Sequence, residues 1–212
     1  MPSLRTPSPP LRSGGVMLRA LRGGDVPAIT EACQDEAIQR WTRVPAPYRE
    51  SDARGWIAAM RARERAGEAL ELAIADAETG LLIGAIGIVT LNWRHRAGEI
   101  GCWVTPSIRG TGIGTTALRL LSRWSLGPLG LERVELRIWE GNDASRMAAE
   151  RAGFAHEGTL RGLVIDRLGG EVRRDVDIYG LLRSDVAAEN APERRAELGG
   201  GRVPISAARA RR

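Results

Sequence analysis

The sequence contains no lysine, so all 31 of its basic residues are arginines, against 26 aspartates and glutamates. It has only two cysteines, Cys33 and Cys102, which cannot build a disulfide framework, and no cysteine–histidine cluster has metal-ligand spacing. No segment approaches the roughly 18 continuous apolar residues that a membrane-spanning helix needs. The longest apolar run, residues 81–91, is interrupted by two glycines and a threonine. Since no apolar signal-peptide core follows the basic N-terminus either, we expect a cytoplasmic protein that uses no metal and contacts no membrane.

The net charge of +5 lies entirely in the two ends of the chain. Residues 1–15 contribute +2 through Arg5 and Arg12, and residues 186–212 contribute +3 through six arginines against three glutamates. Residues 16–185 are therefore neutral, so the basic character of the whole chain is no evidence of a nucleic-acid-binding face on this part of it. Because neither end has apolar periodicity, we expect a disordered tail over 1–15, one domain over 16–185 and a disordered Arg-rich tail over 186–212.

The order of apolar runs and turn signals predicts an α+β domain built on a mixed sheet. Strands are predicted over residues 16–19, 70–75, 81–91, 98–104, 134–139, 154–165 and 171–182. Helices are predicted from Asp25 to about residue 38, from 51 to about 65, from the segment 109–116 to 127, and from Asn142 or Asp143 to 153. These elements make a sheet of about seven strands flanked by about four helices.

A glycine-rich segment lies between the predicted strand 98–104 and the amphipathic helix that follows it. It consists of Arg109, Gly110, Thr111, Gly112, Ile113, Gly114 and Thr115. Glycines let the backbone turn so that successive N–H groups point at one place, and a helix N-terminus adds a positive field. The segment is therefore suited to a pyrophosphate, with Arg109 placed to pair with a further phosphate oxygen. The simpler alternative is a glycine-rich connection that binds no ligand.

Two common phosphate-binding motifs do not fit this segment. A Walker P-loop requires a lysine, which the chain lacks. A Rossmann fingerprint requires G-x-G-x-x-G after an opening βαβ unit, whereas this segment reads G-x-G-x-G and follows an antiparallel region.

The segment instead resembles the R/Q-x-x-G-x-G/A acetyl-CoA signature of the GNAT N-acetyltransferase superfamily, through Arg109, Gly112 and Gly114. Other segments, in the family's own order, are similar to the RimJ/RimL branch, which acetylates N-termini of ribosomal proteins. They are Trp41-Thr42, Val44-Pro45, Pro47 and Tyr48, then residues 99–104, then Asn142-x-x-Ser145, residues 150–158 and Asp177-x-Tyr179-Gly180. The resemblance covers roughly residues 16–185.

The resemblance implies the GNAT fold, with acetyl-CoA as co-substrate and no metal. In that fold the strand before the signature splays from the strand after the next helix, here residues 98–104 and 134–139, and pantetheine occupies the gap. Main-chain groups of Trp103 and Val104 are then expected to hold the pantetheine and polarise the thioester carbonyl. Backbone N–H groups of residues 110–115 are expected to bind the pyrophosphate, and Asn142 the pantetheine arm, although Asn142 also suits a helix N-cap.

The resemblance also bears on the catalytic acid. Many GNAT enzymes place a tyrosine seven residues after the asparagine, but this position is Ala149. In the RimJ/RimL branch a serine one helical turn after the asparagine acts near the sulfur, directly or through water, and here it is Ser145. The alternative role for Ser145 is a local hydrogen bond in the first turn of the helix.

Glu99 is the candidate general base. Some relatives carry a glutamate in a later strand, but residues 163–165 are apolar here. Strand alternation puts Glu99 on one face with Gly101 and Trp103, so it reaches the acceptor side if that face lines the splay. A structurally paired carboxylate is an equal alternative. Asp175 and Asp177 are weaker choices, and water can also carry the proton.

The acceptor is expected to be a primary amine, either the α-amine of a protein N-terminus or a small molecule, and Trp41 and Tyr48 are candidate contacts to it. For Tyr48, plain core packing is the alternative. A different class is a regulator or sensor that binds acyl-CoA without turnover, as the missing tyrosine allows. Dimerisation is common in the family, although nothing in this sequence defines an interface. The arginines of residues 209–212 suggest an electrostatic tether to RNA or the ribosome, with a solvated tail as the favoured alternative.

Overall fold

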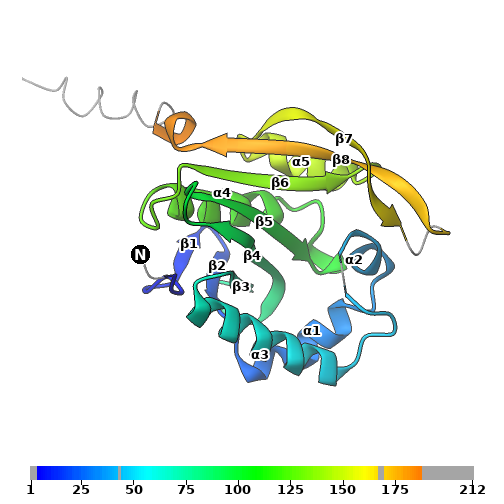
Figure 1. Ribbon diagram of the computed structural model, residues 1–212. Helices are drawn as coiled ribbons and strands as arrows, with labels where there is room; N and C mark the ends of the chain where they lie inside the picture. Colours follow the sequence, from blue (N-terminus) through cyan, green and yellow to red (C-terminus); the bar gives the residue numbers. More distant parts are fainter. Residues whose placement is uncertain (1–3, 43, 167–169, 188–212) are drawn as a thin grey trace, which may run out of the picture.

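The computed structural model describes residues 4–42, 44–166 and 170–187. Within them eight strands form one mixed sheet in the order β1-β2-β3-β4-β5-β6-β8-β7 (Figure 1). The strands are β1 (Leu11–Ser13), β2 (Val16–Ala20), β3 (Leu70–Asp76), β4 (Leu82–Asn92), β5 (Ala97–Val104), β6 (Arg133–Trp139), β7 (Ala155–Asp166) and β8 (Val172–Leu182). The labelled α-helices of the same residues are α1 (Val26–Ala32), α2 (Glu36–Trp41), α3 (Glu50–Ala66), α4 (Ile113–Leu126) and α5 (Asp143–Arg151), and residues 183–187 after β8 are helical as well.

The helices cover both faces of this sheet, and each face has its own apolar cluster (Figure 1). Leu70, Leu72 and Ile74 of β3 pack on the side of α4 and α5, where the apolar stripe of α4 supplies Ala117 and Leu121. The opposite face carries smaller residues and packs against α1, α2 and α3. The alternation of side chains along β3 and β4 thus gives a sheet buried on both faces.

All neighbouring strands are antiparallel except β5 and β6. These two pair in parallel at only three positions, from Ala97 opposite Arg133 to Glu99 opposite Glu135. Beyond Glu99 both strands continue, but the ladder between them stops. The expected splay is confirmed, and it leaves the facing backbone edges of residues 100–104 and 136–139 without a ladder partner.

The single helix predicted from Asp25 to residue 38 is wrong, because the structure has α1 and α2 in its place. Asp35 accepts a hydrogen bond from the backbone N–H of Ile38 at 2.9 Å and so caps a new helix. Aspartate competes in this way with continuation of the helix in which it lies. Asp25 is the N-cap residue of α1, as predicted, but its side chain does not cap the helix. Its carboxylate instead binds Arg19 and the backbone N–H of Arg22.

The N-terminal segment differs from the disordered tail expected over residues 1–15. From Leu4 onward it is placed on the domain: Leu4 is buried, and Thr6 donates two hydrogen bonds to the Glu64 carboxylate. β1 then pairs with β2 and adds an edge strand, the eighth of the sheet. Leu4 and Leu11 contact the core as isolated apolar residues and form no periodic pattern, so their packing could not be predicted from the sequence. Of the expected C-terminal tail, residues 188–212 lie outside the described part of the chain.

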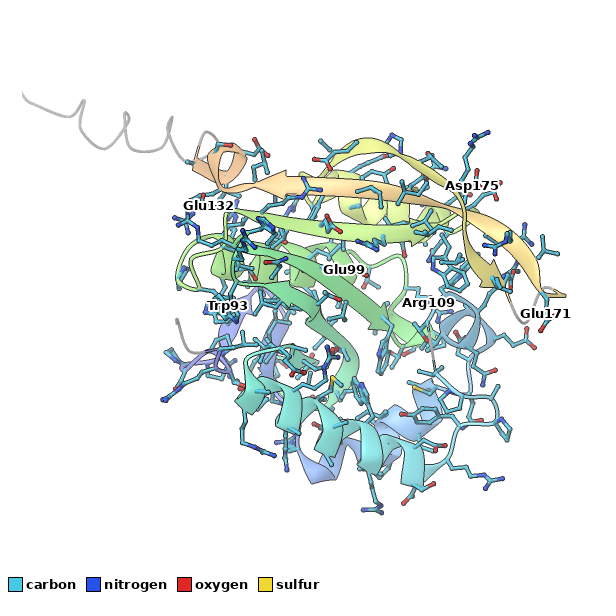
Figure 2. The ribbon with its side chains drawn as sticks, viewed as in Figure 1. Trp93, Glu99, Arg109, Glu132, Glu171 and Asp175 are labelled. Atoms are coloured by element: carbon cyan, nitrogen blue, oxygen red, sulfur yellow. The ribbon has the colours of Figure 1, made fainter. Side chains whose placement is uncertain are left out.

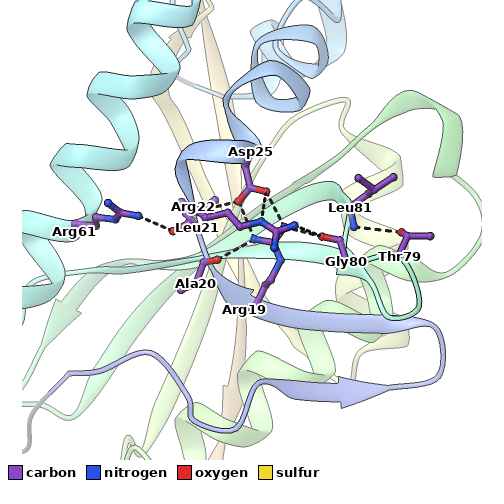
Figure 3. A network of polar contacts seen from close by, with 9 residues as sticks. All are labelled: Arg19, Ala20, Leu21, Arg22, Asp25, Arg61, Thr79, Gly80 and Leu81. Carbon is purple, nitrogen blue, oxygen red and sulfur yellow. Dashed lines mark hydrogen bonds and ion pairs between the residues drawn. The ribbon is translucent and has the colours of Figure 1, made fainter.

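A buried ion pair ties the start of the domain together (Figure 3). Arg19 of β2 donates to both carboxylate oxygens of Asp25, at 2.7 and 2.8 Å, and also to the carbonyl of Gly80 in the β3–β4 turn. Arg22 donates to the same carbonyl, and Arg61 of α3 donates to the carbonyl of Leu21. The network thus fixes β2, the start of α1, the β3–β4 turn and α3 relative to one another.

Candidate acetyl-CoA site

Two short segments meet where β5 and β6 diverge. Because β5 and β6 are parallel, the segments that follow their C-terminal ends lie at the same end of the sheet. After β5 come a turn of 3₁₀-helix (Pro106–Ile108), the glycine-rich segment and α4. After β6 comes a turn through Gly141 and then α5. Figure 2 shows Arg109 at this end, beside α2, and Trp93 at the opposite end of β5.

The glycine-rich segment presents free backbone donors. Gly110 and Gly112 have φ values of 77° and 85°, in the left-handed region that other residues rarely adopt. Gly112 is the N-cap of α4, and no side chain caps this helix. The first helical bond runs from Thr116 N–H to the carbonyl of Gly112, which leaves the N–H groups of residues 113–115 directed out of the helix end. Such a set of donors suits an anion.

Arg109 is already paired in this structure. Its guanidinium donates to both oxygens of Asp35, at 2.5 and 3.3 Å, and so joins the glycine-rich segment to the N-terminus of α2. The hydrogen bond from Arg109 is the main reason why the pKa of Asp35 is lowered below its usual 3.8. Sequence reasoning missed Asp35, whose only signal was an aspartate just before a helical segment.

The backbones of Trp103 and Val104 lie on the edge of β5 that faces the divergence. Their ladder partners on the other edge are Ala85 and Gly84 of β4. The Trp103 side chain packs against the cluster under α1 and α3, whereas that of Val104 packs on the α4 side. The arrangement is the one expected for main-chain contacts to pantetheine, and that role stays a prediction.

Asn142 and Ser145 lie across the divergence from this edge, at the start of α5. Asn142 is the N-cap, and its Oδ1 accepts the backbone N–H of Ser145 at 3.2 Å. The Ser145 side chain is half-buried, and its hydroxyl forms no hydrogen bond with any described residue. Ala149, where other relatives have tyrosine, is fully buried and faces the core. Ser145 is thus available as an acid at this place, and position 149 is not.

The two residues expected to contact the acceptor lie in different surroundings in the structure. Trp41 ends α2 and lies beside the turn before Asn142, since a Cβ added to Gly141 would meet its Cη2 at 3.7 Å. The Arg40 guanidinium stacks over its ring at 4.9 Å. Tyr48 is only 6% exposed and packs with Cys33 in the cluster under α1 and α3, where burial is the main cause that raises its pKa. The expectation that Tyr48 lines an acceptor surface is therefore replaced by core packing.

The candidate bases are all engaged with other groups. Glu99 of β5 forms an ion pair with Arg137 of β6 at 3.4 Å, and Arg137 also binds Glu135. Asp175 accepts the backbone N–H of Gly162 at 2.7 Å, within the β7–β8 hairpin. Asp177 in the same hairpin accepts the Thr159 hydroxyl at 2.6 Å. Sequence reasoning had left a structurally paired carboxylate as the alternative for Glu99, and the ion pair agrees with it.

Among the described residues, no three histidine, cysteine, aspartate or glutamate side chains are placed to hold a metal ion together. No helix of the described part is long and apolar enough to span a membrane.

Comparison with known proteins identifies the class to which this fold and site belong. The family model described as acetyltransferase (GNAT) domain matches residues 16–155. The chain therefore belongs to the GNAT acetyltransferase family and is an N-acetyltransferase of that family.

Three individual proteins show how similar this chain is to members of the family. "Putative ribosomal N-acetyltransferase YdaF" from Bacillus subtilis (strain 168) is 35% identical over 111 residues, which are 52% of this chain and 58% of that protein. Spermidine N(1)-acetyltransferase from Vibrio cholerae is 25% identical over 143 residues, 68% of this chain and 80% of that protein. The structure of Mycobacterium smegmatis RimJ in complex with CoA-disulfide superposes with a TM-score of 0.72 at 24% identity, covering 90% of this chain and 93% of the other. This last similarity shows a common fold.

Removal of the Asp35 charge is expected to strengthen acetyl-CoA binding. In Asp35→Asn the asparagine still caps α2, but Arg109 is released and no carboxylate faces the cofactor phosphates. Since a partly exposed ion pair contributes about 0.2–1 kcal/mol, the Kd for acetyl-CoA should fall by up to about fivefold in calorimetric titrations. The gain in affinity should shrink in 0.5 M salt, because the Debye length is then only about 4 Å and the charges are screened. An unchanged or higher Kd at low salt contradicts the expectation.

Proposed function

We propose that the chain transfers an acetyl group from acetyl-CoA to a primary amine, with the α-amine of a protein N-terminus as the first candidate acceptor. The observation that carries the proposal is the convergence of three features at the end of the sheet where β5 and β6 diverge. They are the free N–H groups of residues 113–115, the unpaired edge of β5 and the available hydroxyl of Ser145.

In the proposed reaction the pyrophosphate lies on the start of α4 and the pantetheine arm on β5, so that the thioester reaches the divergence. A neutral amine attacks the thioester carbonyl carbon, and a C–N bond forms while the C–S bond breaks. The main chain near Trp103 and Val104 stabilises the oxyanion, and Ser145 delivers a proton to the departing sulfur. The proton lost from nitrogen after the attack balances the one delivered to sulfur, and the proton that the ammonium form gives up before the attack needs a separate acceptor.

Two relatives support different acceptors. YdaF is named as a putative ribosomal N-acetyltransferase, which favours a protein acceptor. The M. smegmatis RimJ structure holds a CoA disulfide, which supports a site that binds CoA. The V. cholerae relative acts on spermidine by its name, which makes a polyamine the second candidate. The ion-paired Glu99 and the buried Ala149 favour one further function, an acyl-CoA sensor without turnover.

The test is release of free thiol from acetyl-CoA against a panel of N-terminal peptides, polyamines and aminoglycosides. We expect turnover that depends on the amine, and the best acceptor assigns the class of substrate. In Ser145→Ala we expect kcat to fall about 100-fold, since general acid catalysis contributes 10²–10⁴-fold, while the Kd for acetyl-CoA is unchanged. Tight binding of acetyl-CoA with no turnover on any amine supports the sensor instead.

A further inference from the structure

Glu71 is a carboxyl group on the α3 side of the central sheet that the proposed reaction does not yet use and that no described residue neutralises by contact. It lies on β3, and its side chain is half-buried. No hydrogen bond or ion pair joins its carboxyl group to any described residue. Its nearest charged neighbour is Arg63 of α3, whose guanidinium is occupied by the carbonyl of Val89 and by Glu68. A carboxyl group in such a place is costly to keep unless it has a role.

The strand register shows where this carboxyl group points. Glu71 lies opposite Gly87 of β4, and Gly87 lies opposite Gly101 of β5, so the three residues share one face of the sheet. A Cβ added to Gly87 would lie 2.4 Å from Glu71 Oε2 and 2.8 Å from its Cδ. The carboxyl group therefore lies directly over Gly87, one strand closer to β5 than its own backbone.

Between the Glu71 carboxyl group and the strand that borders the divergence, both residues on this face of the sheet are glycines. The side chain nearest to Gly101 is that of Val89, whose Cγ1 is 3.0 Å from the position of an added Cβ. We call Gly87 and Gly101 the glycine floor. Glu99 and Trp103 flank Gly101 on the same face of β5. With a strand spacing of about 4.8 Å, the carboxyl group over Gly87 lies about two strand spacings from the middle of the β5–β6 divergence. An amine, or an amine and one water, is the right length to span that distance.

We propose that the carboxyl group of Glu71 takes the proton from the acceptor amine across the glycine floor, in place of the ion-paired Glu99. In this step an N–H bond of the protonated acceptor, the ammonium form of the amine, breaks and its proton passes to a Glu71 carboxylate oxygen, directly or through one water. The nitrogen keeps the electron pair with which it attacks the thioester carbon. The proposal rests on the acetyl transfer proposed above and supplies its missing proton acceptor.

The electrostatics of this position suit the task. Burial raises the pKa of Glu71 from 4.5 to about 8, against the opposing influence of the Arg63 charge. The other titratable groups near it are Glu68 of α3's C-terminal turn, Glu99 and the thiol of Cys102, whose own pKa is raised to about 12, mainly by burial and secondarily by Glu71. A protein α-amine has a pKa of about 7.7–8.0 and a lysine-type amine about 10.4. Proton transfer to Glu71 is therefore nearly balanced for an α-amine, which favours a protein N-terminus over a polyamine.

The test compares Glu71→Gln with the wild type in the thiol-release assay, using the amine of the panel that the wild type acetylates fastest. We expect kcat/KM to fall about 100-fold at pH 7.5 and the Kd for acetyl-CoA to stay unchanged. With an N-terminal peptide as the acceptor, the loss should shrink to less than about tenfold at pH 10, because an α-amine is then largely neutral and needs no base. The matched control is Glu68→Gln, which removes an exposed carboxylate beside the same Arg63 and should leave kcat/KM unchanged.

Two further measurements separate this role from a structural one. Gly101→Ala adds a methyl group to the glycine floor, with only Val89 side-chain atoms near it, and should raise the KM for the amine while the Kd for acetyl-CoA is unchanged. The folded state holds the Glu71 proton up to about pH 8 and the unfolded chain only to about 4.5, so this group's stabilisation is lost as the pH rises between these values. The melting temperature of Glu71→Gln should therefore exceed that of the wild type at pH 9 but not at pH 4.

The outcomes distinguish the two proposals. Amine-dependent turnover in the wild type with full activity in Glu71→Gln, or with a loss that is equal at pH 7.5 and pH 10, overturns the role of Glu71 and leaves the acetyl transfer intact. Absence of amine-dependent turnover in the wild type overturns both.

Discussion

Asp25→Ala is expected to destabilise the fold by about 3–5 kcal/mol, because it leaves the buried Arg19 guanidinium without its counter-charge. Arg19 is 8% exposed and Asp25 is 2% exposed, so water cannot replace the carboxylate. Urea unfolding at pH 7 measures the loss. Glu50→Ala is the matched control: it removes the carboxylate of an exposed pair with Arg54 and should cost no more than about 0.5 kcal/mol. Equal losses in the two variants contradict the prediction.

The Asp25 contribution also has a defined dependence on pH. Burial by itself raises the pKa of Asp25, but the hydrogen bonds from Arg19 and from the Arg22 backbone outweigh it, so the pKa lies below the usual 3.8. The stabilisation is therefore fully present above pH 3.8 and is lost as the pH falls through the lower pKa of the folded state. The difference in unfolding free energy between wild type and Asp25→Ala should narrow only in that acidic range.

The order of the elements could be predicted from the sequence because most of them carry a strong periodic or capping signal. The stripe of α4 and the N-cap at Asn142 each lie where the sequence puts them. The predicted hairpin around Gly169 and Gly170 corresponds to β7 and β8, although residues 167–169 lie outside the described part of the chain. The glycine-rich segment was found for the same reason, since only glycines suit its left-handed backbone at positions 110 and 112.

The residues that sequence reasoning missed depend on contacts between distant segments. Asp35 meets Arg109, which is 74 positions away, and Leu4 reaches the core without any local pattern. Glu71 reads as an ordinary polar residue of an alternating strand, and only the register opposite Gly87 shows where its carboxyl group lies. Tyr48 looked accessible in a proline-containing loop, but the loop folds back on α1, where its ring is buried. Such tertiary contacts leave no periodic trace in one sequence.

Gly112→Val is expected to raise the Kd for acetyl-CoA about tenfold or more. Gly112 has a φ of 85° at the N-cap of α4, and a left-handed backbone costs other residues about 1–2 kcal/mol, with β-branched side chains the least tolerant. A Cβ at this position meets nothing within 4 Å, so the effect comes from the backbone and not from a clash within the protein. The valine backbone should leave the left-handed region and turn the N–H groups of residues 113–115 away from the pyrophosphate.

Gly112→Asn is the matched variant, because asparagine adopts the left-handed conformation at a lower cost than valine while it also adds a side chain. We expect calorimetric affinities for acetyl-CoA in the order glycine, asparagine, valine, and unfolding free energies that differ by no more than about 2 kcal/mol. Thiol release at saturating acetyl-CoA should recover in part, since the substitution weakens binding of the cofactor and does not touch Ser145. Equal affinities for the asparagine and valine variants indicate that side-chain bulk governs the site, and wild-type affinity in the valine variant places the pyrophosphate elsewhere.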